Sequence, residues 1–386
     1  MVENCRLHQL SPSASSHLGP IGRPSHEVRR YFASHPLPDA GIAVCAPDDR
    51  ESFEGLTRMS TQAFRLSFLT RRSRASSVER WLRNLPVNNG INYLSDERRY
   101  AHAEDDYDAQ YGVTNIEKTI GCFVLNSIEP TPSTILEIAC GTGHLTTSML
   151  FDGRFDLLVA SDASDRFLEI TKRKAEILPA HDRLRLLRLS DDDFTKIPDN
   201  VFDAIMMRSA LHHFVDFRGV AKLLASKLRA NGALCMLEPR ADFHIASSLI
   251  LKGAKSKASL TSIKWSSAHE SAVNDFVATA EFYLDRKRDK AHAEDKFVFY
   301  FEEFLEIANQ TRTKLSCIGG EYESTFSSTF HDFLQFCMRV DKSIVDDIAV
   351  IVRDELAFMD NAYSSRPRSA AAEWFVFQRQ GVSARS

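Results

Sequence analysis

The sequence predicts an α/β fold built on a doubly wound, mostly parallel β-sheet. Short apolar runs of strand length, at residues 135–138, 157–161 and 204–207, alternate with longer segments of helical character. The first run enters a Gly-x-Gly turn at Gly141 and Gly143, and a helix-like segment follows the turn. Strands that alternate with helices form parallel sheets, and such sheets bind ligands at the carboxyl ends of their strands.

The first strand, residues 135–138, contains one acid, Glu137, and leads into the glycine turn. Glycine suits Gly141 and Gly143 because a Cβ would block a ligand's approach or the positive φ of the turn. The start of the next helix directs unpaired N–H groups and a partial positive charge at the ligand. A dinucleotide fingerprint would place a third glycine where Thr146 stands, so a dehydrogenase is the least favoured function.

The second and third strands are also followed by acidic residues. The run 157–161 ends at Asp162, about 20 residues beyond the turn, where a carboxylate can hold a ribose diol. The alternative role of Asp162 is to cap the helix that begins near Ser164. A third strand is expected over residues 183–189, and the acidic run 191–193 follows it.

The fourth and fifth strands are expected over residues 204–207 and 233–237. Arg208, His212 and His213 follow the fourth strand. Successive helical residues point about 100° apart, so we expect only one of the two histidines to face a ligand. Either histidine could act as a general base, and the alternative is that both serve packing or capping.

This succession resembles the small-molecule branch of the class I S-adenosylmethionine-dependent methyltransferases. The order acid-x-x-x-Gly-x-Gly matches the family's first motif, and a Leu-His-His segment after the fourth strand is common in this branch. The resemblance covers roughly residues 100–238 and a closing strand at 373–379. It implies a Rossmann-like, seven-stranded, mostly parallel sheet, the cofactor S-adenosyl-L-methionine, and methyl transfer to a small-molecule acceptor through an undetermined O, N or C atom.

The resemblance also implies roles for the residues at the strand ends. Glu137 would hold the cofactor's ammonium, directly or through water, although it could instead tie down loop N–H groups. Asp191 and Asp192 would lie at the adenine edge, although the run of three aspartates leaves the assignment open by one position. Asp193 is expected in solvent. Arg208 departs from the family's small or amide residue, and it would reach the methionyl carboxylate, an acidic substrate or solvent. The predicted cofactor-binding residues are Glu137, Ala139, Cys140, Gly141, Thr142, Gly143, Asp162, Ala163, Asp191, Asp192, Arg208, Tyr107 and Tyr111, the catalytic candidates are His212 and His213, and no metal is expected.

Residues 95–125 are expected to form a helix before the first strand. In resembling enzymes this helix lines the site, so Tyr107 and Tyr111 could face the cofactor. Because they are four residues apart, they could equally form a packing pair on one helix face.

Four regions are expected along the chain. Residues 1–90 are Arg- and Ser-rich and predict a flexible extension. Residues 91–240 would form the cofactor-binding core, 241–300 a helical insertion, and 301–386 the rest of the core with a second helical insertion at about 326–362. The two insertions would form a cap that closes over the substrate.

Composition narrows the class of protein. The 386 residues are 44% hydrophobic and 26% charged, as in ordinary globular proteins, and the net charge of -4 gives no support to a nucleic-acid partner. The seven cysteines include no Cys-x-x-Cys, so a disulfide framework or structural zinc is not expected. No run approaches the ~18 apolar residues of a membrane span, and no secretory signal is expected.

Alternatives remain for location and function. We expect a cytoplasmic protein, but the acid-poor, Arg-rich stretch 59–81 resembles an organelle transit peptide. That stretch could also be a surface-binding helix or a solvated basic helix. The rival functions are methylation of a macromolecule docked by this arm and a catalytically idle cofactor-binding subunit, and the oligomeric state is open.

Overall fold

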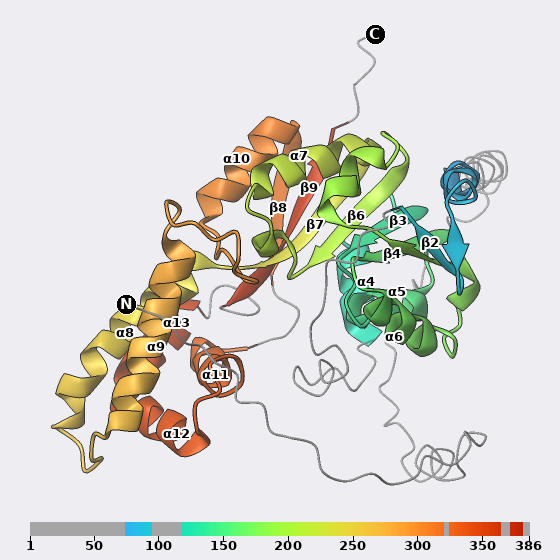
Figure 1. The fold of residues 1–386 in the computed structure, drawn as a ribbon. Helices are drawn as coiled ribbons and strands as arrows, with labels where there is room; N and C mark the ends of the chain where they lie inside the picture. The colour runs from blue at the N-terminus through green and yellow to red at the C-terminus, as the bar shows by residue number, and fades with distance from the viewer. Residues whose placement is uncertain (1–73, 95–117, 320–323, 364–370, 381–386) are drawn as a thin grey trace, which may run out of the picture. The chain divides into compact units, whose positions relative to one another are not determined.

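The computed structural model describes residues 74–94, 118–319, 324–363 and 371–380 (Figure 1). Most of the expected N-terminal extension, including residues 59–73 of the basic stretch, lies outside the described residues. The same is true of Tyr107 and Tyr111, so their predicted place beside the cofactor is untested.

The described residues form a nine-stranded mixed sheet in the order β1-β2-β5-β4-β3-β6-β7-β9-β8. The strands are β1 Val87–Asn88, β2 Ile91–Tyr93, β3 Thr134–Ile138, β4 Leu157–Asp162, β5 Leu184–Arg188, β6 Phe202–Arg208, β7 Leu228–Pro239, β8 Thr313–Gly319 and β9 Ala372–Arg379. The six strands from β2 to β7 are parallel, whereas β1 is antiparallel to β2, and β9 is antiparallel to both of its neighbours, β7 and β8. The strand order reverses direction between β3 and β6, so the predicted ligand site falls at this switch point.

The expected count of seven strands is wrong because two more strands form at one edge. Asn89 and Gly90 connect β1 to β2, and both have positive φ, 49° and 79°. Asn-Gly with two positive φ angles is the preferred two-residue hairpin turn. Ile91 is buried, and β2 pairs in parallel with β5. These residues lie at the boundary that was expected between the extension and the core.

A helix over residues 74–82 also packs on the core. Its Val78 and Leu82 are buried in the same apolar cluster as Leu136 of β3 and Leu187 of β5. Residues 74–90 therefore belong to the folded part of the chain, and the extension expected to reach residue 90 is shorter.

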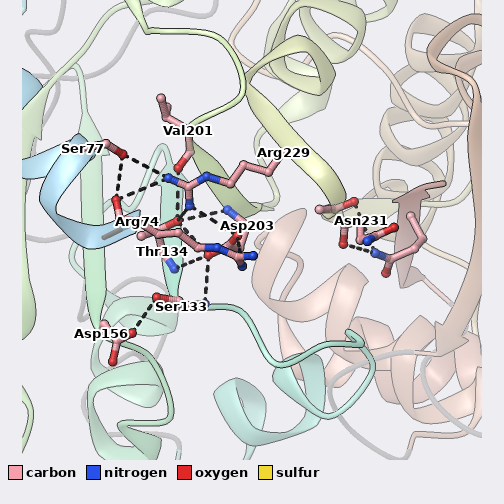
Figure 2. Close-up of polar contacts among 11 residues, drawn as sticks. Arg74, Ser77, Ser133, Thr134, Asp156, Val201, Asp203, Arg229 and Asn231 are labelled. Carbon is pink, nitrogen blue, oxygen red and sulfur yellow. Dashed lines mark hydrogen bonds and ion pairs between the residues drawn. The ribbon is translucent and has the colours of Figure 1, made fainter. Parts of the chain in front are cut away.

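Asp203 of β6 attaches this helix to the sheet (Figure 2). Its Oδ2 accepts hydrogen bonds from the backbone N–H groups of Ser133 and Thr134, at 3.2 and 3.0 Å. Its Oδ1 lies 3.0 Å from Nη1 of Arg74 and 3.4 Å from Nη1 of Arg229. These contacts join the start of β3, the start of β6 and the N-terminal helix. They lie at the amino ends of the central strands, whereas the site is predicted at the carboxyl ends.

Helices cover both faces of the sheet. They are α4 Lys118–Leu125, α5 His144–Asp152, α6 Asp165–Ala175, α7 Phe217–Lys227 and α10 Phe301–Thr311. Side chains alternate along a strand, so Leu136 and Ile138 of β3 join one apolar cluster with α7 and α10, while Ile135 joins another with α4 and α5. Glu137 has the same parity as Ile135, and it therefore points toward α5.

The two expected insertions are helical and share one apolar cluster. The first contains α8 Ala241–Ala258 and α9 Ser267–Leu284, and the second contains α11 Phe326–Asp332, a π-helical turn Phe333–Cys337, α12 Lys342–Ile351 and α13 Arg353–Tyr363. Phe243 and Phe276 from the first insertion are buried together with Phe326, Phe330 and Ile348 from the second. Figure 1 shows these helices gathered beside the sheet. None of the described helices is both long and apolar enough to cross a membrane.

Candidate cofactor and active site

The loop after β3 has a backbone that only glycine adopts readily. Gly141 and Gly143 have φ of 54° and 85°. A Cβ on Gly143 would lie 2.8 Å from Thr171 of α6, so this glycine lets α6 pack against the loop. A Cβ on Gly141 would meet no atom of the described residues within 4 Å. Within the described part of the chain, Gly141 therefore borders open space at the carboxyl end of the central strand.

Asp162, the last residue of β4, fixes the loop. Its Oδ2 accepts a hydrogen bond from the N–H of Gly141 at 2.8 Å, and its Oδ1 accepts one from the N–H of Ser164 at 2.9 Å. The capping residue of α6 is Ser164, whose Oγ accepts from the N–H of Phe167 at 3.1 Å. Asp162 therefore does not cap α6 itself, and its carboxylate is held beside the open space at Gly141.

Glu137 is buried beneath the loop. Its Oε2 accepts a hydrogen bond from the Thr146 hydroxyl at 2.6 Å. Burial raises the pKa of Glu137 to about 8, although Thr146 and the charge of Arg208 oppose the shift. Glu137 is thus largely protonated at neutral pH. Glu137 holds the start of α5 through Thr146, the residue that stands where a dinucleotide fingerprint has its third glycine. This contact resembles the alternative role given to Glu137 above, in which it ties down the loop.

The other predicted cofactor residues surround this centre. Arg208 ends β6, is half-buried, and lies close enough for its charge to act on Glu137. Ala139 is exposed, Cys140 and Thr142 are buried, and Ala163 is half-buried. Burial raises the pKa of the Cys140 thiol well above its usual value, so this cysteine is not a reactive thiolate.

The acidic run after β5 differs from expectation at its third residue. Asp191 and Asp192 are exposed, whereas Asp193, which was expected in solvent, is buried. Asp193 accepts a hydrogen bond from Ser190 Oγ at 2.7 Å and pairs with Lys196 Nζ at 2.6 Å. A 3-10 turn over residues 191–196 turns the third side chain inward. The contact of the exposed Asp191 and Asp192 with the adenine stays a prediction.

A buried carboxylate, Glu238, organises the segment after β6. Glu238 is the penultimate residue of β7 and is fully buried. It accepts hydrogen bonds from the backbone N–H groups of Ala210, Leu211 and His212 at 3.0, 2.7 and 3.3 Å. It also lies 2.7 Å from Nδ1 of His212. One carboxylate therefore fixes both the 3-10 turn Leu211–His213 and the orientation of the His212 ring.

Both histidines approach a third group, Asp295. Nε2 of His212 and Nδ1 of His213 lie 3.3 and 3.5 Å from its Oδ1, and the two ring centroids are 4.2 Å apart. The expectation that only one histidine faces a ligand assumed a regular helix, whereas this is a three-residue turn and Asp295 reaches both rings from another segment. Which of the two faces a ligand stays a prediction. The N–H of Lys296 donates to the carbonyl of His212 at 3.0 Å and holds the two segments together.

The two histidines have opposite charge preferences. Burial alone would lower the pKa of His212, but the carboxylates of Glu238 and Asp295 raise it to about 9. Burial and the neighbouring charge of His212 lower the pKa of His213. At neutral pH His212 is therefore an imidazolium and His213 is neutral. An imidazolium cannot accept a proton, so His212 is a poor general base in this state.

Two residues of this cluster were not predicted from the sequence. Glu238 carried a signal, since it is an acid at the end of a buried strand, as Asp162 is. Asp295 carried none, because it lies in a polar stretch between α9 and α10 with no periodic pattern.

Residues 136–236 match the sequence model of the family described as "Methyltransferase domain". Over these residues the chain is similar to that family. The match runs from β3 into β7, so it includes the glycine loop, Asp162, Arg208 and both histidines.

Solved structures with a similar fold are distant in sequence. YcgJ from Bacillus subtilis is 15% identical, over 68% of this chain and 99% of that one, with a TM-score of 0.42. Phosphoethanolamine N-methyltransferase 2 from Haemonchus contortus is 12% identical over 72% and 56% of the two chains, with a TM-score of 0.39. Geranyl diphosphate C-methyltransferase from Streptomyces coelicolor is 12% identical over 77% and 89%, with a TM-score of 0.39. No curated protein matches the sequence. At these values the likenesses assign no substrate to this protein.

Proposed function

We propose that the protein transfers a methyl group from S-adenosyl-L-methionine to a small-molecule acceptor. The observation that carries this proposal is the open space in front of Gly141, bordered by a loop that Asp162 holds in place. A nucleoside can approach the backbone there without meeting a Cβ. The cofactor supplies an activated methyl group on a positively charged sulfur, so the protein's task is mainly to position the two reactants.

We assign the cofactor's polar groups to charged side chains near the loop. A carboxylate oxygen can accept more than one hydrogen bond, so Asp162 can bind the ribose hydroxyls while it retains Gly141 and Ser164. Glu137 and Arg208 carry opposite charges when ionised, and they suit the ammonium and the carboxylate of the methionyl end. Asp191 and Asp192 stay the proposed adenine contacts.

The acceptor side is assigned to His212, His213 and Asp295. The first helical insertion reaches this cluster, because the charge of Asp295 acts on the hydroxyl of Tyr283 in α9. The pKa of Tyr283 is raised by burial and then by the charge of Asp295, so its hydroxyl stays protonated at neutral pH. A helical insertion in contact with the cluster favours an enclosed acceptor, as a small molecule requires.

Three measurements test this proposal. S-adenosyl-L-methionine and S-adenosyl-L-homocysteine should raise the melting temperature of the full-length protein, whereas NADH should not. Asp162→Asn should weaken cofactor binding by about 1–3 kcal/mol, the range for hydrogen bonds to a charged group. With methyl-labelled cofactor and a cell extract, label should enter the low-molecular-mass fraction. Label found only in protein or nucleic acid would contradict the small-molecule assignment.

A further inference from the structure

We propose that His212, His213 and Asp295 bind a divalent transition-metal ion beside the acceptor. One ring nitrogen of each histidine and one carboxylate oxygen lie within 4.8 Å of one another. The distances from Asp295 Oδ1 to His212 Nε2 and His213 Nδ1 are 3.3 and 3.5 Å. Ligand atoms bound ~2.1 Å from one ion lie roughly 3–3.5 Å apart, so the three side chains are already close to the spacing of a metal site.

Glu238 gives His212 the orientation of a metal ligand. Its carboxylate is fully buried, and it lies 2.7 Å from Nδ1 of His212. That hydrogen bond leaves Nε2 on the side of Asp295. Metal-binding histidines characteristically donate their second ring N–H to a carboxylate or carbonyl, which fixes the ring and its tautomer. Because three backbone amides also hold Glu238, the ring of His212 is placed before any ion arrives.

The remaining ligands are held by the segment before α10. The N–H of Lys296 donates to the carbonyl of His212 at 3.0 Å, next to Asp295 in sequence. The carbonyl of Glu294 lies 3.0 Å from Nδ1 of His213 and brings another oxygen to the same side of that ring. These atoms contact one another, and a bound ion would replace those contacts.

The donor set indicates the class of metal. Two imidazole nitrogens and one carboxylate oxygen suit Zn²⁺, Mn²⁺, Fe²⁺ or Co²⁺ better than Mg²⁺ or Ca²⁺, which prefer oxygen ligands. Three protein ligands leave coordination positions open. An oxygen of the acceptor could fill one of them, so this site favours a small molecule with a hydroxyl or carboxylate group. That last step rests on the proposed methyl transfer, whereas metal binding itself does not.

The test is a Co²⁺ titration of the untagged, full-length protein after dialysis against a chelator. We expect visible absorption bands that saturate at one equivalent of Co²⁺. Asp295→Asn should weaken binding at least about tenfold, and its unchanged melting curve would show that the variant folds. The matched control is Asp346→Asn, because Asp346 pairs with His331 at 2.9 Å but has no second histidine in the described clusters that could hold a metal. This control should bind Co²⁺ as the wild type does.

Absence of Co²⁺ bands in the wild type, or equal affinity in Asp295→Asn, would overturn the metal site. S-adenosyl-L-homocysteine binding, measured on the same samples by calorimetry, separates the two proposals. A protein that binds this cofactor product but no Co²⁺ contradicts only the metal site. A protein that binds Co²⁺ through Asp295 but no cofactor product contradicts the proposed function and supports the metal site.

Discussion

At the scale of single residues, the protonation of Glu137 connects burial to ligand binding. Its carboxyl group is buried, and burial raises its pKa from 4.5 to about 8. The folded, ligand-free protein therefore binds a proton that the unfolded chain releases near its ordinary pKa. Stability from this group is present at low pH and is lost as the pH rises from about 4.5 to about 8.

This charge state predicts that cofactor binding releases a proton. The ammonium of the cofactor favours the ionised form of Glu137, so affinity should rise on the order of tenfold per pH unit between about pH 5.5 and about pH 7. Calorimetry in buffers of different ionisation enthalpy measures the released proton. Glu137→Gln should abolish the release, and Glu176→Gln should not, because Glu176 is the exposed residue that follows α6. Binding enthalpies that are equal in all buffers would contradict the assignment of Glu137 to the ammonium.

The two loop glycines predict different effects of the same substitution. Alanine at either position adopts an unfavourable positive φ, which costs about 1 kcal/mol or more. Gly143→Ala also places a Cβ 2.8 Å from Thr171, so it should lower the free energy of unfolding further than Gly141→Ala does. Gly141→Ala should instead weaken cofactor binding at a smaller loss of stability. Urea unfolding and calorimetry on both variants separate the effects, and equal losses of stability would count against the difference in packing.

At the scale of elements, the sequence predicted the strands that are apolar throughout and missed the short ones. β3, β4 and β6 are buried runs between recognisable turns, and the structure places them as expected. β1 and β2 have two and three residues, too few for a period, although the Asn89-Gly90 turn was a usable hairpin signal. The helix over residues 74–82 was not predicted, because these residues continue the Arg-rich stretch that was assigned to the flexible extension. Its two buried apolar residues, Val78 and Leu82, are too few to stand out among the arginines.

The contacts at Asp203 predict how strongly this helix is attached. Asp203 is buried and accepts hydrogen bonds from backbone and arginine groups, so Asp203→Ala should lower the free energy of unfolding by about 3–5 kcal/mol. Arg74 is 43% exposed, so Arg74→Ala should cost less than about 1 kcal/mol. Denaturant unfolding of both variants gives the comparison. A loss at Arg74 as large as the loss at Asp203 would show that the arginine, and not the β3 backbone, is the main partner of the carboxylate.

At the scale of the whole molecule, the sequence predicted two helical insertions but not that they share a core. Their apolar residues lie about eighty positions apart, and no local pattern pairs Phe243 with Phe326, whose rings are 5.3 Å apart. The position of Asp295 beside the histidines has the same cause, because it depends on how the chain returns to the sheet after α9. Contacts between distant segments of this kind are set by tertiary packing and leave little trace in local sequence.

The shared core predicts that the inserted helices respond together. Phe326→Ala should cost about 3–5 kcal/mol, since the ring is fully buried. Hydrogen exchange should become faster in α8, α9 and α12 at once, while β3 and β4 keep their protection. Phe358→Ala on α13 is the control, because its ring is 70% exposed. Faster exchange confined to α11 would mean that the two insertions are independent.

The place of β9 in the sheet has a consequence for how the chain folds as it is synthesised. β9 lies between β7 and β8 and is hydrogen-bonded to both, and Trp374, Phe375 and Phe377 are buried. Within the described sheet β8 pairs with no other strand. When β7 and β8 leave the ribosome, the strand that must join them has not yet been made. The apolar edge of β7 stays uncovered until residues 372–379 emerge, and a nascent chain stalled before that point exposes a template for pairing with other molecules.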